Sequence, residues 1–226
     1  MSREFFERRP YSLIAEPDAE PGNYVLRIVE REAAPFRWSA IAADAAHNLR
    51  SSLDILWRFA IHGGSPTARR AHFPIYDSAN EFETRFRGVP QNPTVKAAFD
   101  IIKATKPYKG GNDALWHLNA IDIKDKHEML ILAVVAFRSL LIKADPAKVI
   151  QMRREDFLTP VEDGTVMARL TGDIPAPMEM QHEFSFEVAF GKGEMLEGEP
   201  VLPTLHQFSN AVDGVVDAFL AAGLLP

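Results

Sequence analysis

Ionisable residues interrupt two stretches of this chain that otherwise have the pattern of buried helices. The first stretch is residues 47–54, HNLRSSLD, and the second is residues 118–127, LNAIDIKDKH. Burying a charged side chain costs free energy unless the charge is paired, ligated or used in chemistry. Any fold of this chain must therefore supply partners for these side chains, and we expect a candidate functional site where they meet.

Hydrophobic periodicity and turn residues predict an α+β fold. Residues 129–142 are strongly apolar and fit a buried helix, a buried strand, or one followed by the other; we expect helix to about Ala136 and strand from Ser139. A strand is also expected at 23–30. The predicted elements are long helices at about 38–62, 94–105 and 112–136, an antiparallel β meander at about 139–190, and a closing helix at about 204–222. We predict one domain over 1–226, with a helical part to about 137 and the sheet with its closing helix from about 138.

Composition excludes several classes of protein. None of the 226 residues is cysteine, which excludes disulfide scaffolds, thiolate metal sites and cysteine nucleophiles. The net charge of −6 argues against a dedicated nucleic-acid binder, which usually has a basic face. Because no segment has the apolar run of a signal peptide or the roughly 20 apolar residues of a membrane span, we expect a cytoplasmic protein without a membrane partner.

The first long helix is predicted to have two distinct faces. At about 100° per residue, one apolar face contains Trp38, Ile41, Ala45, Leu49, Ser52, Leu56 and Ala60, and a polar row opposite contains Asp44, His47, Ser51, Asp54 and Arg58, with Arg50 at its edge. No glutamate or lysine occurs between residues 38 and 62, although both are common on exposed helices. The short or planar polar groups used instead favour burial of this row against a second helix.

The third helix supplies the expected partners. Its leucine face, with Leu115 and Leu118, continues through Asn119 and Asp122, where a core would favour apolar groups. Buried polar groups need hydrogen-bond partners, and His47, Arg50 or Asp54 of the first helix are the obvious ones. We therefore predict that His47 and Asp122 are neighbours and are shielded from water.

Three hypotheses account for such a cluster. The first is a purely structural network of ion pairs that joins two helices, in a protein that binds or interacts without catalysis. The second is metal-independent acid–base catalysis on an anionic, phosphate-bearing substrate. Its residues are His47 and His127 as proton-transfer groups, Asp54 and Asp122 as the carboxylates that orient them, Arg50 and Lys126 as holders of the anion, and Asn48, Asn119, Tyr108 and Lys109 as further substrate-binding groups.

The third hypothesis is a divalent metal held by His47 with Asp44 or Asp54 and with Asp122 or His127. The chain lacks a tight spacing of metal ligands, and the nearby Arg50 and Lys126 would compete with a cation for the carboxylates. We therefore predict no metal and no cofactor, and place acid–base hydrolysis ahead of the metal hypothesis. Composition does not decide between an enzyme and a binding protein, nor does it define the oligomeric state.

Residues 47–54 resemble a motif, HNLRSxLD, of a family of bacterial and phage proteins that has no established activity. The segment 73–75, the segment 107–111 and the IDxxDKH segment 121–127 extend this resemblance over most of the chain. The resemblance implies a shared fold and a bacterial or phage source, and it supplies no mechanism.

A remoter resemblance is to HEPN-type helical domains, many of which are metal-independent ribonucleases that use an arginine and a histidine on one helix. The three residues between Arg58 and His62 make a shorter spacing than the one those domains use. As an analogy, this resemblance implies RNA as one phosphate-bearing substrate for the acid–base hypothesis.

Overall fold

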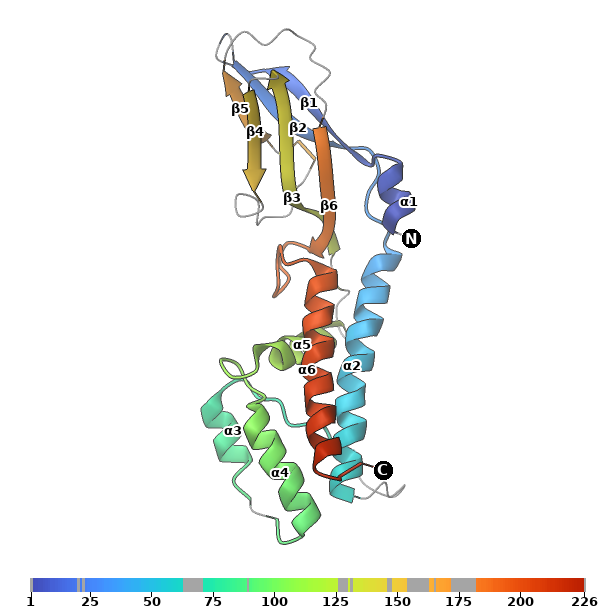
Figure 1. Cartoon of the computed structure of the whole chain (residues 1–226), viewed down its shortest axis with the longest axis vertical. Coiled ribbons are helices and arrows are strands. Elements are labelled where there is room, and N and C mark those ends of the chain that lie inside the picture. The colour runs from blue at the N-terminus through green and yellow to red at the C-terminus, as the bar shows by residue number, and fades with distance from the viewer. Residues whose placement is uncertain are drawn as a thin grey trace. The chain divides into compact units, whose positions relative to one another are not determined.

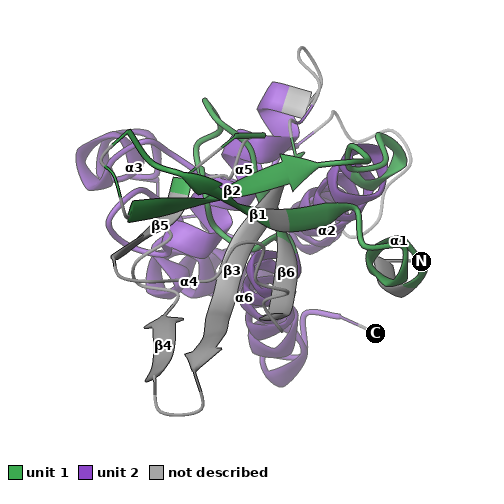
Figure 2. Ribbon diagram, turned by 90° about the horizontal axis from the view of Figure 1, so that it is seen from above, with its two compact units in different colours: residues 1–38, 131–201 green, residues 39–130, 202–226 purple. Residues whose placement is uncertain are grey.

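A computed structural model gives the fold of the chain and describes residues 2–19, 21, 23–62, 71–88, 90–125, 130, 132–145, 148–153, 163–164, 166–171 and 182–225 (Figure 1). The chain forms two compact units, coloured separately in Figure 2. Unit 1 contains residues 1–38 and 131–201, and unit 2 contains residues 39–130 and 202–226. Each unit is thus built from two stretches of chain, and residue 137 does not divide them.

Unit 2 is helical and contains the candidate site. Its helices are α2 (Arg37–His62, from Ser39 onward), α3 (Ala79–Arg85), α4 (Pro93–Thr105), α5 (Asp113–Asp125) and α6 (Val201–Ala221, from Leu202 onward). Polar side chains cap their amino ends: Asn92 accepts hydrogen bonds from the N–H groups of Thr94 and Val95, and Asn112 accepts one from Leu115. The predicted helices at 38–62 and 94–105 and the closing helix are confirmed.

Helix α3 is not among the predicted elements. Its signal is present in the sequence as Ser78-Ala79-Asn80-Glu81, in which Ser78 accepts a hydrogen bond from the Glu81 N–H at 3.2 Å. This spacing of serine and glutamate is the capping box that marks a helix start.

The buried face of α2 differs from the predicted one. Ala46, Leu53 and Trp57 are buried, whereas Ile41, which was expected in the core, is 50% exposed. Aromatic rings from α2, α4 and the end of α3 pack together around Trp57. The buried face is therefore rotated around the helix from the expected one, towards the side that carries Ala42 and Ala46, because small side chains allow the neighbouring helices to approach closely.

The described part of unit 1 contains two antiparallel three-stranded sheets and a short helix. The elements are α1 (Ser2–Glu7), β1 (Tyr11–Pro17), β2 (Asn23–Glu30), β3 (Leu132–Asp145), β4 (Lys148–Arg153), β5 (Val166–Thr171) and β6 (His182–Phe190). The strand orders are β1-β2-β5 and β4-β3-β6, which confirms the α+β fold class and the strand at 23–30.

The predicted meander is correct only in part. Strands β3 and β4 are antiparallel neighbours, but β5 pairs with β2 in the other sheet, for example Leu170 with Tyr24. A run of strand residues specifies a strand but not its neighbour. The free edge of β2 determines the choice here, since β1 already satisfies the backbone groups on its other side.

The predicted extension of the third helix to about Ala136 is wrong. Helix α5 ends at Asp125, and β3 already begins at Leu132. Leu132 pairs with Phe190 and Val134 with Val188 of β6, so the backbone groups of this segment are satisfied by a distant strand. An apolar run of this length fits either structure by its pattern, and the long-range pairing decides between them. Among the helices that the structure describes, none is both long and apolar enough to cross a membrane.

Candidate functional site

The polar side chains of α2 and α5 meet within unit 2. His47 Nδ1 lies 2.7 Å from Asp122 Oδ1, although 75 residues separate them in the chain. Asp122 is buried, at 4% exposure, whereas 51% of the His47 side chain is exposed. The prediction that these two residues are neighbours is confirmed, and the prediction that water is kept from both is correct only for Asp122.

The hydrogen bond to Asp122 determines how the His47 ring presents its two nitrogens. A carboxylate accepts, so Nδ1 carries the proton and donates it, and Nε2 of the neutral ring is left as an acceptor. Ser51 lies one helical turn further along α2, and its Oγ is 3.4 Å from Nε2. Ser51, His47 and Asp122 thus form a row, although Ser51 was not among the predicted site residues. Ser51 follows His47 by four residues, and this spacing is the sequence signal that could have placed Ser51 among the predicted site residues.

Arg50 occupies the buried part of the cluster. Its Nε donates to Asn119 Oδ1 at 2.8 Å, one terminal nitrogen donates to Asp54 Oδ1, and the other donates to the Phe73 carbonyl at 3.2 Å. The residue is only 6% exposed. One guanidinium therefore joins α2, α5 and the segment before α3, and all three of its nitrogens donate to groups of the protein.

Asp54 is the acceptor at the centre of this buried network. Its Oδ1 also accepts from the Phe73 N–H at 2.7 Å, and its Oδ2 lies 3.0 Å from His72 Nδ1. Burial by itself would raise the pKa of Asp54. The hydrogen bonds from His72 and the Phe73 N–H and the charge of Arg50 outweigh burial and hold the pKa below its ordinary value of 3.8.

This lowered pKa predicts how the network responds to acid. Because the folded protein holds the Asp54 proton less tightly than the unfolded chain does, the carboxylate stabilises the fold above its ordinary pKa, and this stabilisation is lost as the pH falls through the lower native value. We expect the difference in free energy of unfolding between the wild type and Asp54→Asn to be constant from pH 7 to about 5 and to shrink below about pH 4. Urea titrations over this range measure it. A difference that stays constant at every pH would contradict the charged network.

The remaining predicted residues lie in other surroundings. The Tyr108 ring packs 5.5 Å from the Phe82 ring, and the Lys109 ammonium lies 4.9 Å above the Trp116 ring. Asn48 lines a groove between α2 and α6. These contacts are separate from the His47–Asp122 pair, so they do not support substrate binding at that pair. Lys126 and His127 lie outside the described residues.

The arrangement in unit 2 thus contains two parts with different properties. The buried part is the clamp of Arg50, Asp54, Asn119 and the Phe73 backbone. The other part, the accessible row, consists of Ser51 and the half-exposed His47, with the buried Asp122 behind the ring. Within the described residues, no group of three histidine or acidic side chains is placed to hold a metal ion. Comparison of the chain with protein-family models, with curated proteins and with solved structures found no match. The site is therefore interpreted from its own geometry.

Proposed function

We propose that the accessible row is an acid–base site, in which His47 transfers protons during metal-independent hydrolysis of an anionic, phosphate-bearing substrate such as RNA. One observation carries the proposal: Nδ1 of a half-exposed imidazole is held 2.7 Å from a buried carboxylate. A general base needs such an arrangement, because Nδ1 orients the ring through its hydrogen bond and Nε2 is left to face the reactant.

In the reaction His47 would act first as a base and then as an acid. Nε2 accepts a proton from water as the water oxygen forms its bond to phosphorus, and the carboxylate of Asp122 stabilises the imidazolium that results. As the bond between phosphorus and the leaving oxygen breaks, Nε2 passes this proton to that oxygen. In the alternative, a second acid such as His127 gives its own proton to the leaving oxygen, and His47 releases the proton on Nε2 to solvent. Ser51 Oγ, 3.4 Å from Nε2, lies on the side from which water would approach.

Holding the anion requires a cation that is free to face it. The buried Arg50 donates to three groups of the protein, so its geometry supports a positioning role in which it holds α2 against α5. Of the two cations that the sequence analysis named for the anion, this leaves Lys126 for the anion-holding role.

The test is a substitution that keeps the hydrogen bond to Asp122 but removes the second nitrogen. In His47→Asn, the side-chain amide takes the place of Nδ1–H and nothing replaces Nε2. With bis(p-nitrophenyl) phosphate and a short single-stranded RNA as probes, we expect turnover to fall by at least about 100-fold while the free energy of unfolding changes by less than about 1 kcal/mol. His62→Asn on the same helix is the matched control, and we expect it to retain wild-type turnover.

A non-enzymatic binding or interaction protein is the second candidate, and the wholly internal partners of Arg50 favour it. In that case the wild type hydrolyses neither probe. His47→Ala, which leaves Asp122 without this donor, then lowers the free energy of unfolding by about 1–3 kcal/mol, while His47→Asn retains it. Turnover that survives in His47→Asn would also remove His47 from any catalytic role.

A further inference from the structure

Helix α2 carries a row of exposed and half-buried residues on the side away from its buried face. Members of the row alternate at spacings of four and three, which is the repeat of helices that pack along one another. Ile55 is 70% exposed, Ile41 50% and Phe59 37%, although large apolar residues usually lie inside a protein. We call this set the α2 row; it contains Ile41, Ala45, Asn48, Ser52, Ile55 and Phe59.

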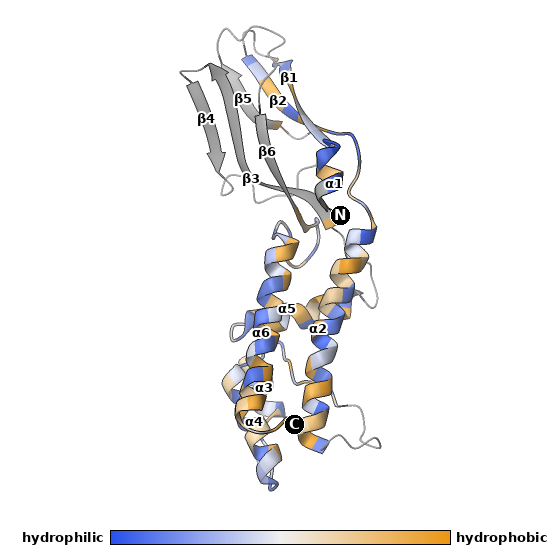
Figure 3. Ribbon diagram, turned by 45° about the vertical axis from the view of Figure 1, so that its right-hand side comes forward, coloured by the Kyte–Doolittle hydropathy of each residue, from blue (hydrophilic) through white to orange (hydrophobic). Residues whose placement is uncertain are grey.

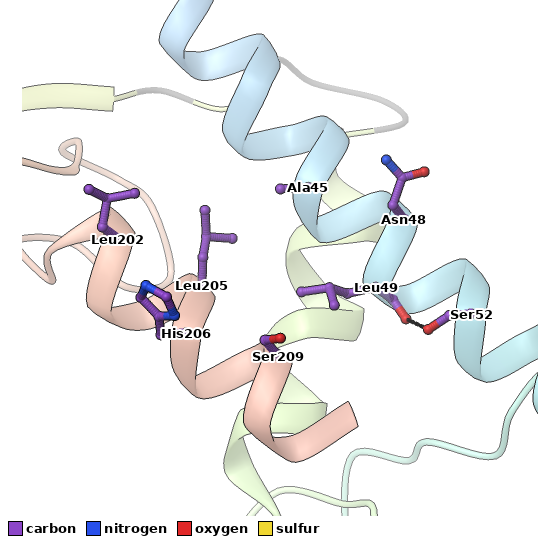
Figure 4. Close-up of a pocket in the computed structure, with 8 residues that line it drawn as sticks. All are labelled: Ala45, Asn48, Leu49, Ser52, Leu202, Leu205, His206 and Ser209. Atoms are coloured by element: carbon purple, nitrogen blue, oxygen red, sulfur yellow. Dashed lines mark hydrogen bonds between the residues drawn. The ribbon is translucent and has the colours of Figure 1, made fainter. Parts of the chain in front are cut away.

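The α2 row borders a groove within unit 2. The groove has a volume of about 510 Å³, and its opposite wall is formed by Leu202, Leu205, His206 and Ser209 of α6 (Figure 4). Leu202 is 66% exposed, so the apolar surface continues from α2 onto α6. Figure 3 shows apolar and polar positions alternating along both helices. A continuous apolar surface of this kind is typical of a helix-binding site.

Charges beside the row indicate which helix would bind. Asp44, Ser51 and Arg58 flank the row on one side at a spacing of seven, and both charged residues are exposed. Consider a second α2 that runs antiparallel to the first, with the twofold axis between Asn48 and Ser52. In this arrangement each Asp44 would face Arg58 of the other copy. In a parallel pair, Asp44 and Arg58 would instead face the opposite flank of α2 in the second copy. On that flank Ala42 and Leu56 are buried in the core of their own chain. Charge complementarity therefore favours an antiparallel partner of the same sequence.

We propose that the α2 row is the interface of a symmetric homodimer, in which α2 packs antiparallel against α2 of a second copy. The symmetry pairs Ile41 with Phe59 and Ala45 with Ile55 of the other chain, so the apolar residues of each copy cover those of its neighbour. Asn48 meets Ser52 at the centre. The Ser52 hydroxyl donates to the Leu49 carbonyl at 2.7 Å, so its oxygen is left to accept from the Asn48 amide of the second copy.

Charge reversal at the two flanking positions tests this arrangement. Wild-type protein, measured by sedimentation equilibrium, is expected at twice the 25.2 kDa chain mass. Asp44→Arg places like charges together at both ends of the interface, as does Arg58→Asp. Each is expected to weaken dimerisation by at least about tenfold in Kd, whereas the double variant restores the pairs and dimerises like the wild type. Mixing the two single variants is expected to produce heterodimers.

Asp100→Arg on α4 is the matched control, because it reverses an exposed charge away from the α2 row, and it should leave the dimer unchanged. A monomer at every concentration up to about 100 μM would overturn the proposal, as would dimerisation that is equally strong in all the variants. A monomer would leave the groove for a different occupant. The outcome is independent of the proposed catalytic role of His47, since the α2 row does not contain that residue.

Discussion

Replacing Arg50 with methionine is expected to lower the free energy of unfolding by about 3–5 kcal/mol. Methionine fills much of the same volume but donates no hydrogen bond. The change removes the Arg50 donor from three acceptors, namely Asn119 Oδ1, Asp54 Oδ1 and the Phe73 carbonyl, although Asp54 Oδ1 still accepts from the Phe73 N–H. The largest penalty comes from Asp54, whose carboxylate loses its closest positive charge while it stays partly buried.

Equilibrium urea titration measures this loss, followed by tryptophan fluorescence to which Trp57 and Trp116 of unit 2 and Trp38 of unit 1 contribute. Arg85→Met is the matched control: Arg85 is exposed and pairs with Glu81 at 3.0 Å on the surface of α3, so its replacement should cost less than about 0.5 kcal/mol. Arg50→Lys retains the charge but cannot span three partners, and we expect an intermediate loss. Equal stability of Arg50→Met and Arg85→Met would show that the buried clamp contributes nothing.

Replacing Phe86 with alanine is the second substitution expected to have a large effect, again about 3–5 kcal/mol. The Phe86 ring is 7% exposed and stacks on Phe99, with ring centres 4.2 Å apart, and on Phe82 at 5.1 Å. The Trp57 ring centre lies 6.1 Å away. The substitution removes the central ring of this cluster and leaves a cavity where α2, α3 and α4 meet.

The same urea titration measures the effect of Phe86→Ala. Native-state fluorescence should also change, because one wall of the Trp57 environment is lost. Phe36, which is 64% exposed, offers the control, and Phe36→Ala should change the free energy of unfolding by less than about 0.5 kcal/mol. A loss in Phe86→Ala as small as the control's would mean that the three helices do not depend on this cluster.

The two substitutions probe different contributions to the stability of unit 2. The aromatic cluster joins α2, α3 and α4 through apolar contact, whereas the Arg50 clamp joins α2 to α5 through hydrogen bonds. Aromatic contact tolerates small displacements, but a guanidinium with three partners requires defined positions for each. The clamp therefore sets the alignment of α2 and α5 that brings His47 to Asp122, and its loss should affect the candidate site as well as stability.

Much of the helical unit could be predicted, because its signals are local. Pro93 after Asn92 and the asparagine at 112 mark helix starts by chemistry that operates within one turn. The proximity of His47 and Asp122 was also predictable, since two helices with polar residues in otherwise apolar patterns satisfy one another at the lowest cost.

The amino-acid sequence by itself determined the helix starts, the strand at 23–30, the α+β class and the residues that had to find polar partners, because each depends on neighbours in the chain or on the cost of burying charge. Only the tertiary structure decided that residues 132–136 form a strand, that β5 joins β2, and that the Ile41 side of α2 is exposed. It also decided which polar residues are buried as a clamp and which remain accessible. These outcomes depend on which distant segment packs against each strand edge or helix face. The local sequence pattern does not specify that segment.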